Sequence, residues 1–359
     1  MSLVKTIWGI LFRLFPCPTK VGLQRIGNPG PDSPVFVTCN FHLTVKRLKH
    51  ILRGFDLWLL VGDSKGVNVW CAAGAEEFNT HSVVSIVKTS GIEDKVNHRT
   101  LILPPLGAPG IKASDVKAQT GWKVEWGPAY AEDIPRYLGN NFRKDETMKR
   151  AKYDLTKRLD TAIGTLFPFY FLGAVGFFLF GQHLLMDYLV SGAAAFVVFM
   201  SLVLRIPGKI GIIKALFCDA VLIAVLLTGE LLFDSFPFRI PLIIAMVMIP
   251  VYGLELGGIA STMPSDLDPV LARFGVRAIG NVAFAGTIRT ELLNGYRELT
   301  YERQLCLGCQ SCYEVCPQGV WKKGESKKAE LVNKDACTAC RACLVQCESG
   351  AIKAPRIME

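Results

Sequence analysis

The sequence predicts three structural parts: an α/β Rossmann-like domain, an all-α transmembrane bundle, and a small α+β domain rich in cysteine. Three observations support this fold class. Short apolar segments alternate with amphipathic ones over residues 22–160, four long apolar segments follow over residues 161–262, and eight of the twelve cysteines form two runs after residue 301. A chain of 359 residues has room for all three parts.

Residues 1–21 form a predicted interfacial helix that precedes these parts. The segment is apolar on one helical face, but Lys5 and Arg13 interrupt it. It is too short and too charged to span a bilayer, and it lacks a small-residue cleavage site. We therefore expect it to lie on the inner leaflet of the membrane.

The α/β domain at 22–160 is predicted from alternating strands and helices. The expected strands are Val35–Thr38, Leu57–Val61, Thr100–Leu103 and Lys123–Trp126, and the expected helices are His42–Leu52, Glu76–Thr89 and Ala113–Gln119. Such alternation gives a mostly parallel, doubly wound sheet, in which ligands bind outside the carboxyl ends of the strands. The loops at 38–40, 62–68 and 103–110 are therefore the candidate ligand-binding segments, although 103–110 is equally well read as an ordinary tight loop.

The stretch GVNVWCAAG at 66–74 is unusual within this domain. A thiol, Cys71, is followed by Ala72, Ala73 and Gly74, which have almost no side chain, so a large flat ligand could approach the backbone here. The sulfur is the only group in the stretch that suits a soft metal. The alternative is that Cys71 is a small buried hydrophobic residue, as most lone cysteines are.

The string NVWCAAG resembles the cap-helix motif of HgcA, the family of corrinoid proteins in microbial mercury methylation. The resemblance continues through HRTLILPPLGAPGI (98–111) and GWKVEWGPAYAEDIPRYL (121–138). It implies that 22–160 binds a cobalamin-type corrinoid, with Cys71 as the catalytic residue and lower axial ligand of cobalt. It implies further corrinoid contacts from Thr38, Asn68, Val69, Trp70, Ala72, Ala73, Gly74, Leu106, Gly107, Ala108, Pro109 and Gly110. One departure is Ala75, where the family has lysine.

Four apolar segments of about 20 residues each are predicted to span a membrane: Ala162–Gln182, Leu184–Leu204, Ile210–Leu232 and Ile240–Ala260. The connection RIPGK (205–209) carries two basic residues and is placed inside, whereas the connection at 182–184 has none and is placed outside. An even number of spans puts both soluble domains in the cytoplasm. Pro250 is expected to kink the fourth span.

The net charge of +9 is assigned to the inner leaflet rather than to nucleic acid, because no nucleic-acid recognition motif accompanies it. Asp219 and Glu255 fall within the predicted spans, and we expect both to hydrogen-bond to neighbouring helices. Residues 263–300 are interpreted as a linker.

The last part, 301–359, is predicted to be a ferredoxin-like domain with two [4Fe–4S] clusters. Both cysteine runs have the spacing C-x2-C-x2-C-x3-C, and in two-cluster ferredoxins the fourth cysteine of each run binds the other cluster. One cluster should therefore use Cys306, Cys309, Cys312 and Cys347, and the other Cys337, Cys340, Cys343 and Cys316. A pair of structural zinc sites is the alternative, which the regular spacing disfavours. The spacing also points to a reducing cytoplasm.

The segment CLGCQSCYEVCPQGVW (306–321) resembles HgcB, the ferredoxin partner of HgcA, so the whole chain resembles a fusion of the two. Two features depart from the pattern. The second run ends in Cys347–Glu348, where ferredoxins usually have Cys-Pro, and the ending ESGAIKAPRIME lacks the further cysteines found in HgcB.

The leading hypothesis is a corrinoid-dependent methyltransferase in the cytoplasmic membrane that transfers a methyl group from cobalt to Hg(II). Its expected partners are a methyl-folate or methyl-pterin donor protein and a low-potential electron donor. One alternative keeps this chemistry with another soft electrophile as acceptor. The second is a membrane electron-transfer protein without methyltransferase activity.

Overall fold

The structure is a computed structural model that describes residues 3–13, 15–74, 76–151, 153–206, 211–233, 237–257, 299–338 and 340–353. Ala75 and nearly all of the predicted linker lie outside these residues. The chain divides into two compact units. The first comprises Met1–Gly9, Phe15–Lys152 and Pro264–Glu359, and the second comprises Ile10–Leu14 and Tyr153–Met263.

A five-stranded sheet of order β1-β3-β2-β4-β5 forms the centre of the α/β domain. Its strands are β1 (Gly22–Ile26), β2 (Val35–Cys39), β3 (Leu57–Gly62), β4 (Thr100–Leu103) and β5 (Lys123–Trp126). The four predicted strands are confirmed and pair in parallel. The sequence analysis missed β1, which pairs antiparallel with β3 at the sheet edge. Because β1 is only partly buried and contains Gln24 and Arg25, it has no strong apolar pattern.

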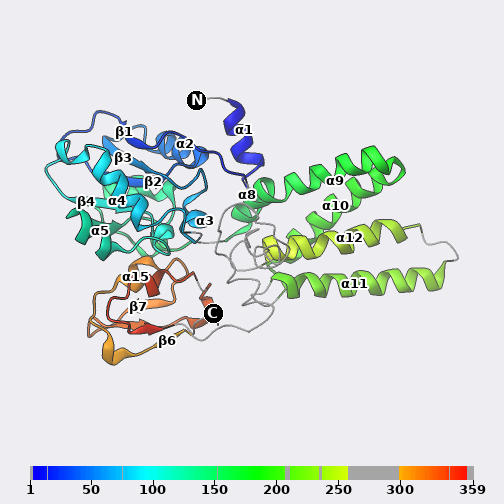
Figure 1. Cartoon of the computed structure of the whole chain (residues 1–359). Helices are drawn as coiled ribbons and strands as arrows, with labels where there is room; N and C mark the ends of the chain where they lie inside the picture. Colours follow the sequence, from blue (N-terminus) through cyan, green and yellow to red (C-terminus); the bar gives the residue numbers. More distant parts are fainter. Residues whose placement is uncertain are drawn as a thin grey trace. The chain divides into compact units, whose positions relative to one another are not determined.

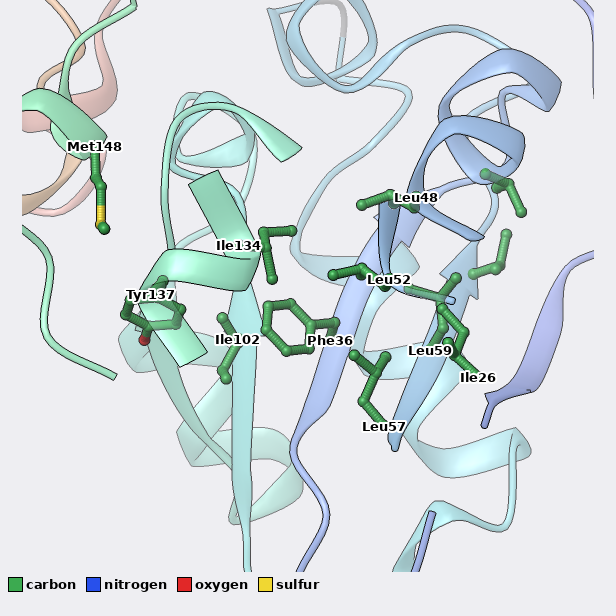
Figure 2. Close-up of a cluster of buried hydrophobic side chains, with 12 residues drawn as sticks. Ile26, Phe36, Leu48, Leu52, Leu57, Leu59, Ile102, Ile134, Tyr137 and Met148 are labelled. Atoms are coloured by element: carbon green, nitrogen blue, oxygen red, sulfur yellow. The ribbon is translucent and has the colours of Figure 1, made fainter. Parts of the chain in front are cut away.

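Helices cover both faces of the sheet (Figure 1). On one face, α2 (His42–Ile51) and α6 (Ile134–Gly139) close a buried core over Phe36, Leu59 and Ile102. Figure 2 shows this core, with Leu48 and Leu52 lying over the sheet. Right-handed crossovers place α4 (Thr80–Thr89) and α5 (Ala113–Thr120) on the opposite face, against β3 and β5. The sheet is therefore doubly wound, as predicted.

The helix predicted at Glu76–Thr89 is wrong at its start. Two separate helices are present, α3 (Val69–Gly74) and α4. Asn79 caps α4, since its Oδ1 accepts a hydrogen bond from the backbone N–H of Ser82 at 3.0 Å. This break leaves α3 as a short, independent helix that carries Cys71.

The described part of the second unit contains the amphipathic helix α8 (Leu155–Thr165) and the apolar helices α9 (Phe167–Phe180), α10 (Gln182–Leu202), α11 (Gly211–Leu232) and α12 (Arg239–Tyr252). Among the described residues, α10 and Ile213–Leu232 are long and apolar enough to cross a membrane. The predicted first span is instead the pair α8 and α9, bent by 44°. The bend coincides with Pro168 in the first turn of α9, where a proline is tolerated but cannot continue the preceding helix.

The fourth predicted span is also shorter than expected. The 14-residue α12 contains Pro250, and the chain continues as a π-helix, η4 (Gly253–Gly257). Proline removes a backbone donor, which accounts for the loss of the α-helical pattern just beyond it. Glu255 is buried in η4, and its backbone O accepts a hydrogen bond from the Tyr153 hydroxyl. The described structure records no hydrogen-bond partner for Asp219 Oδ1.

Two smaller parts complete the first unit. The predicted N-terminal helix is present as α1 (Leu3–Leu11), whose Thr6 accepts a hydrogen bond from Lys46 of α2 at 2.8 Å, while its location at a membrane surface stays a prediction. The cysteine-rich domain has two antiparallel strand pairs and two short helices. These elements are β6 (Thr300–Tyr301), α15 (Ser311–Val315), β7 (Trp321–Lys323), β8 (Ala329–Leu331), α16 (Ala342–Val345) and β9 (Ile352–Lys353).

Candidate functional site

One buried side chain, Asn40, ties together the loops at the carboxyl edge of the sheet. Its Oδ1 accepts hydrogen bonds from the backbone N–H groups of Ser64 at 3.0 Å and Gly66 at 2.9 Å. Gly66 has a φ of 77°, and a Cβ there would lie 2.5 Å from the backbone N of Pro18, so glycine is required. The loop after β3 is therefore held in one conformation before the chain reaches Cys71.

The sequence analysis named Thr38 rather than Asn40 in this region. Thr38 lies inside β2, where it is buried and paired with Val61 of β3. Asn40 is the residue directly beyond the strand, and its amide can both donate and accept. A signal was present in the sequence, since an asparagine directly after an apolar strand often orders the next loop.

Cys71 lies in the first turn of α3. The side chain of Asn68 caps this helix, because its Oδ1 accepts a hydrogen bond from the backbone N–H of Cys71 at 3.1 Å. Cys71 is 3% exposed, and Ala72 and Ala73 are fully buried. The cap thus fixes the backbone that carries the sulfur, and the neighbouring side chains are the smallest available.

The segment after β4 packs against α3. It contains η2 (Pro105–Gly107), which contacts α3 directly. A Cβ on Gly110 would lie 2.7 Å from the backbone O of Ala73 and 2.5 Å from that of Phe78, so this close approach requires glycine. At Gly107, a Cβ would lie 3.7 Å from the side chain of Val69.

The structure therefore brings together the two predicted binding segments, 68–74 and 106–110. Gly107 and Ala108 are buried, and the predicted contact residues Trp70, Leu106 and Pro109 are half-buried. Their role as corrinoid contacts stays a prediction. Chemically, the assembly offers one soft sulfur donor, Cys71, next to residues with very small side chains.

The eight cysteines of the last domain fall into two neighbourhoods. Burial, followed by the negative charges of Cys309, Cys306 and Cys347, raises the pKa of the Cys312 thiol to about 12. This neighbourhood joins three cysteines of the first run to the last cysteine of the second run. It matches the membership expected from the crossed pattern.

The second neighbourhood has the reciprocal composition. Burial, followed by the charges of Cys340, Cys316 and Cys337, raises the pKa of the Cys343 thiol well above its ordinary value. The backbone N–H of Val320 also donates to the Cys316 sulfur at 3.4 Å. Thiolates that repel one another in this way are stabilised by a bound cation, so the donor set suits an iron–sulfur cluster.

Metal ligation itself stays a prediction at these positions. Across the residues that the structure describes, no group of three or more His, Cys, Asp or Glu side chains is arranged to hold a metal ion. Five of the cysteines nevertheless lie at the core of the domain around Trp321 and Ile352, two buried within it and three partly buried against it. Those five are Cys312, Cys316, Cys337, Cys343 and Cys347.

Comparisons with known proteins divide the chain in the same way. Residues 14–138 match the family model of the CO dehydrogenase/acetyl-CoA synthase delta subunit, and residues 298–348 match the 4Fe-4S dicluster domain. These matches are consistent with the resemblance to HgcA and HgcB, but they are not specific to those families.

Relatives of the first region are gamma subunits of the acetyl-CoA decarbonylase/synthase complex. The chain is 37% identical over 133 residues to that of Archaeoglobus fulgidus, covering 36% of this chain and 28% of the relative. It is 37% identical over 125 residues to that of Methanopyrus kandleri, covering 34% and 27%. The chain thus spans little more than a quarter of these relatives, and its first 138 residues are similar to subunits of acetyl-CoA synthase complexes while its end is similar to 4Fe-4S dicluster domains.

Proposed function

We propose that the chain is a corrinoid-dependent methyl-transfer protein that carries its own iron–sulfur electron donor. The observation that carries the proposal is the position of Cys71. Cys71 lies on a short capped helix and is followed by Ala72 and Ala73, and this helix packs against the 104–111 segment. This site belongs to a domain similar to subunits of acetyl-CoA synthase complexes.

The residues present fit a large flat cofactor. Ala72, Ala73 and Gly110 bring the backbones of α3 and the 104–111 segment close together, and Asn68 sets the position of the Cys71 backbone through the helix cap. A corrinoid bound here would supply a cobalt ion that accepts and donates a methyl group, and the Cys71 sulfur would hold that cobalt. A sulfur donor enriches the metal in electrons, which favours delivery of the methyl group to an electrophile.

The last domain would supply low-potential electrons to this site. In the proposed assignment, Cys306, Cys309, Cys312 and Cys347 hold one [4Fe–4S] cluster, and Cys337, Cys340, Cys343 and Cys316 hold the other. The two thiol neighbourhoods described above support this crossed assignment. An external low-potential donor would recharge the clusters.

We propose Hg(II) as the methyl acceptor and a methyl-folate or methyl-pterin protein as the donor, both on the resemblance to HgcA and HgcB. The alternative acceptor is another soft electrophile. Ala75, at the position where the family has lysine, favours that alternative. The similarity to acetyl-CoA synthase subunits is compatible with either acceptor.

We also propose that residues 153–263 span the cytoplasmic membrane and that both soluble domains face the cytoplasm. Two helices are long and apolar enough by composition, and the bent pair α8 and α9 would add a third. The described residues of the first compact unit lie on both sides of this segment in the sequence, up to Ala151 and again from Leu299. An insertion whose two ends belong to one unit can cross a bilayer only an even number of times, which supports four spans with α12 as the fourth.

Metal content tests the proposal most directly. The purified chain from a cobalamin-sufficient host is expected to contain about one cobalt per chain and a corrinoid spectrum. The Cys71→Ala variant should keep the corrinoid but show the spectrum of cobalt without a sulfur ligand, and methyl transfer should collapse. The Cys39→Ala variant is the control, since Cys39 is buried in β2 and is assigned only a packing role.

The same measurement separates the two other interpretations. Iron without cobalt in the parent chain would favour an electron-transfer protein without methyltransferase activity. A cobalt-containing chain that fails to methylate mercury in cells lacking the native gene would favour another acceptor. Methyl transfer in Cys71→Ala as fast as in the parent would exclude the sulfur from the chemistry.

A further inference from the structure

The side chain of Gln346 joins the iron–sulfur domain to the segment that packs over α3. Its Nε2 donates to the backbone O of Ala108 at 3.0 Å and of Ile111 at 2.7 Å. Its Oε1 accepts from the backbone N–H of Ala113 at 3.2 Å. Both amide hydrogens and the oxygen are thus used, and Gln346 is 6% exposed. Buried polar groups left unpaired are costly, so this contact specifies one seating of the domain.

A second contact lies on α15 and involves charges. Glu314 forms ion pairs with Lys144 at 2.8 Å and with Lys149 at 3.4 Å. The Lys149 ammonium also lies 3.7 Å from the centre of the Tyr313 ring. The side chains of Lys144 and Lys149 are less than 10% exposed, so these pairs are screened little by solvent.

The positions of the two contacts indicate which of the two proposed clusters lies nearer the Cys71 site. Gln346 directly precedes Cys347, and α15, which contacts η2, contains Cys312. Cys312 and Cys347 pack in or against the same core of the domain, and the crossed pattern assigns both to one cluster. Both segments that meet the 105–113 segment therefore carry cysteines of one proposed cluster, and that segment in turn packs against the helix of Cys71.

From this juxtaposition we propose that Gln346 is a positioning residue. It seats the iron–sulfur domain on residues 108–113, so that the cluster of Cys306, Cys309, Cys312 and Cys347 is the one next to the Cys71 site. Electrons leave the domain through that cluster. One electron passes from the reduced cluster, which returns to its oxidised state, to the bound corrinoid, and the external low-potential donor replaces it. The identity of the electron acceptor rests on the proposed function. The docking of the iron–sulfur domain on residues 108–113 does not depend on it.

Hydrogen exchange on the full chain tests the seating. Gln346→Leu keeps the bulk of the side chain and removes all three hydrogen bonds. In this variant the amide of Ala113 should exchange at least tenfold faster, since the free energy of about one neutral hydrogen bond is lost. Amides of the sheet should not change. Unchanged exchange at Ala113 would overturn the proposal.

A matched pair of variants separates seating from cluster assembly. Gln310 is also adjacent to a cysteine of the first run, but its Nε2 donates to Lys327 within the iron–sulfur domain. Gln346→Asn should speed exchange at Ala113, whereas Gln310→Asn should not, and both should keep the iron content and the electron paramagnetic resonance spectrum of the parent. An equal effect of the two changes would overturn a specific role for Gln346.

Electron delivery tests the exit cluster. With the clusters reduced by Ti(III) citrate and excess reductant removed, corrinoid reduction should be at least tenfold slower in Gln346→Leu and unchanged in Gln310→Asn. Faster exchange with unchanged delivery would overturn the exit assignment. A parent chain without cobalt would refute the proposed function alone, because the exchange measurements do not need the corrinoid.

Discussion

Replacing Gly110 by alanine should disturb the Cys71 site without removing any functional group. The added Cβ would lie 2.5 Å from the backbone O of Phe78 and 2.7 Å from that of Ala73, with the Cα of Ala73 at 3.1 Å. Overpacking of this kind costs about 1–3 kcal/mol, and the upper half of that range applies because backbone atoms must move. A cost of about 2–3 kcal/mol corresponds to a roughly 30- to 150-fold shift in the local opening equilibrium.

Two other glycines provide a graded series for this prediction. At Gly107 the nearest atom is the flexible end of Ile111 at 3.2 Å, so Gly107→Ala should cost about 1 kcal/mol or less, roughly fivefold. At Gly30 no described atom lies within 4 Å of the added Cβ, so Gly30→Ala should have no effect on α3.

The assay is hydrogen exchange at the amides of residues 71–74, together with retention of corrinoid during gel filtration. Exchange should increase in the order Gly30→Ala, Gly107→Ala, Gly110→Ala, and corrinoid retention should fall in the same order. If Gly110→Ala behaves like Gly30→Ala, the close packing of the 104–111 segment on α3 does not hold the site together.

Three further changes test other parts of the molecule. Cys316→Ala should remove about one cluster's iron while the cluster of the first three cysteines keeps its spectrum, and loss of the latter instead would contradict the crossed pattern. Asn40→Ala should cost about 1–3 kcal/mol, because two buried N–H groups lose their acceptor, and it should loosen residues 63–68 in limited proteolysis, unlike Asn333→Ala at an exposed position. Burial raises the pKa of Glu314, but the charges of Lys144 and Lys149 outweigh it and lower the pKa below 4.5. The stabilisation from the Glu314 ion pairs is therefore complete above about pH 4.5 and is lost below it. Hydrogen exchange of residues 144–151, corrected for the intrinsic pH dependence of exchange, should rise only in that acid range in the parent chain. It should not rise there in Glu314→Gln.

The sequence was sufficient for the regular parts of the fold because burial and periodicity act locally. The four parallel strands were predicted with ends within one residue of those observed, since each is a short apolar run bounded by turn residues. The strand β1 was missed because an edge strand with one solvent-exposed face needs no apolar pattern. The first span was predicted as one segment, Ala162–Gln182, and the 44° bend between α8 and α9 was not foreseen, because hydropathy does not register the effect of one proline on helix direction.

The candidate site was only partly predictable for a different reason. Cys71 and the glycine-containing loop stand out in the sequence, because small residues and a thiol are visible residue by residue. The role of Asn40 depends on which loops the sheet order brings together, and that of Gln346 on a contact 233 residues away along the chain. The position of Asn40 directly after a strand is a local signal, but the backbone groups that it binds are not marked locally, and nothing local marks Gln346, so tertiary structure was needed to assign both roles.

The distance along the chain between Ala113 and Gln346 means that the two residues are synthesised at different times. Ribosomes add about 5–20 residues per second, so Ala113 emerges roughly 10–50 s before the Gln346 that will bind it. During this interval the 108–113 segment lacks the domain that later covers it, and a bulky cofactor meets an open site. Loading during synthesis should therefore be faster than loading of the finished chain, which pulse-labelling with radioactive cobalt would measure. The order of segments along the chain would then determine the order of assembly, in which the cofactor binds first and the iron–sulfur domain is synthesised last.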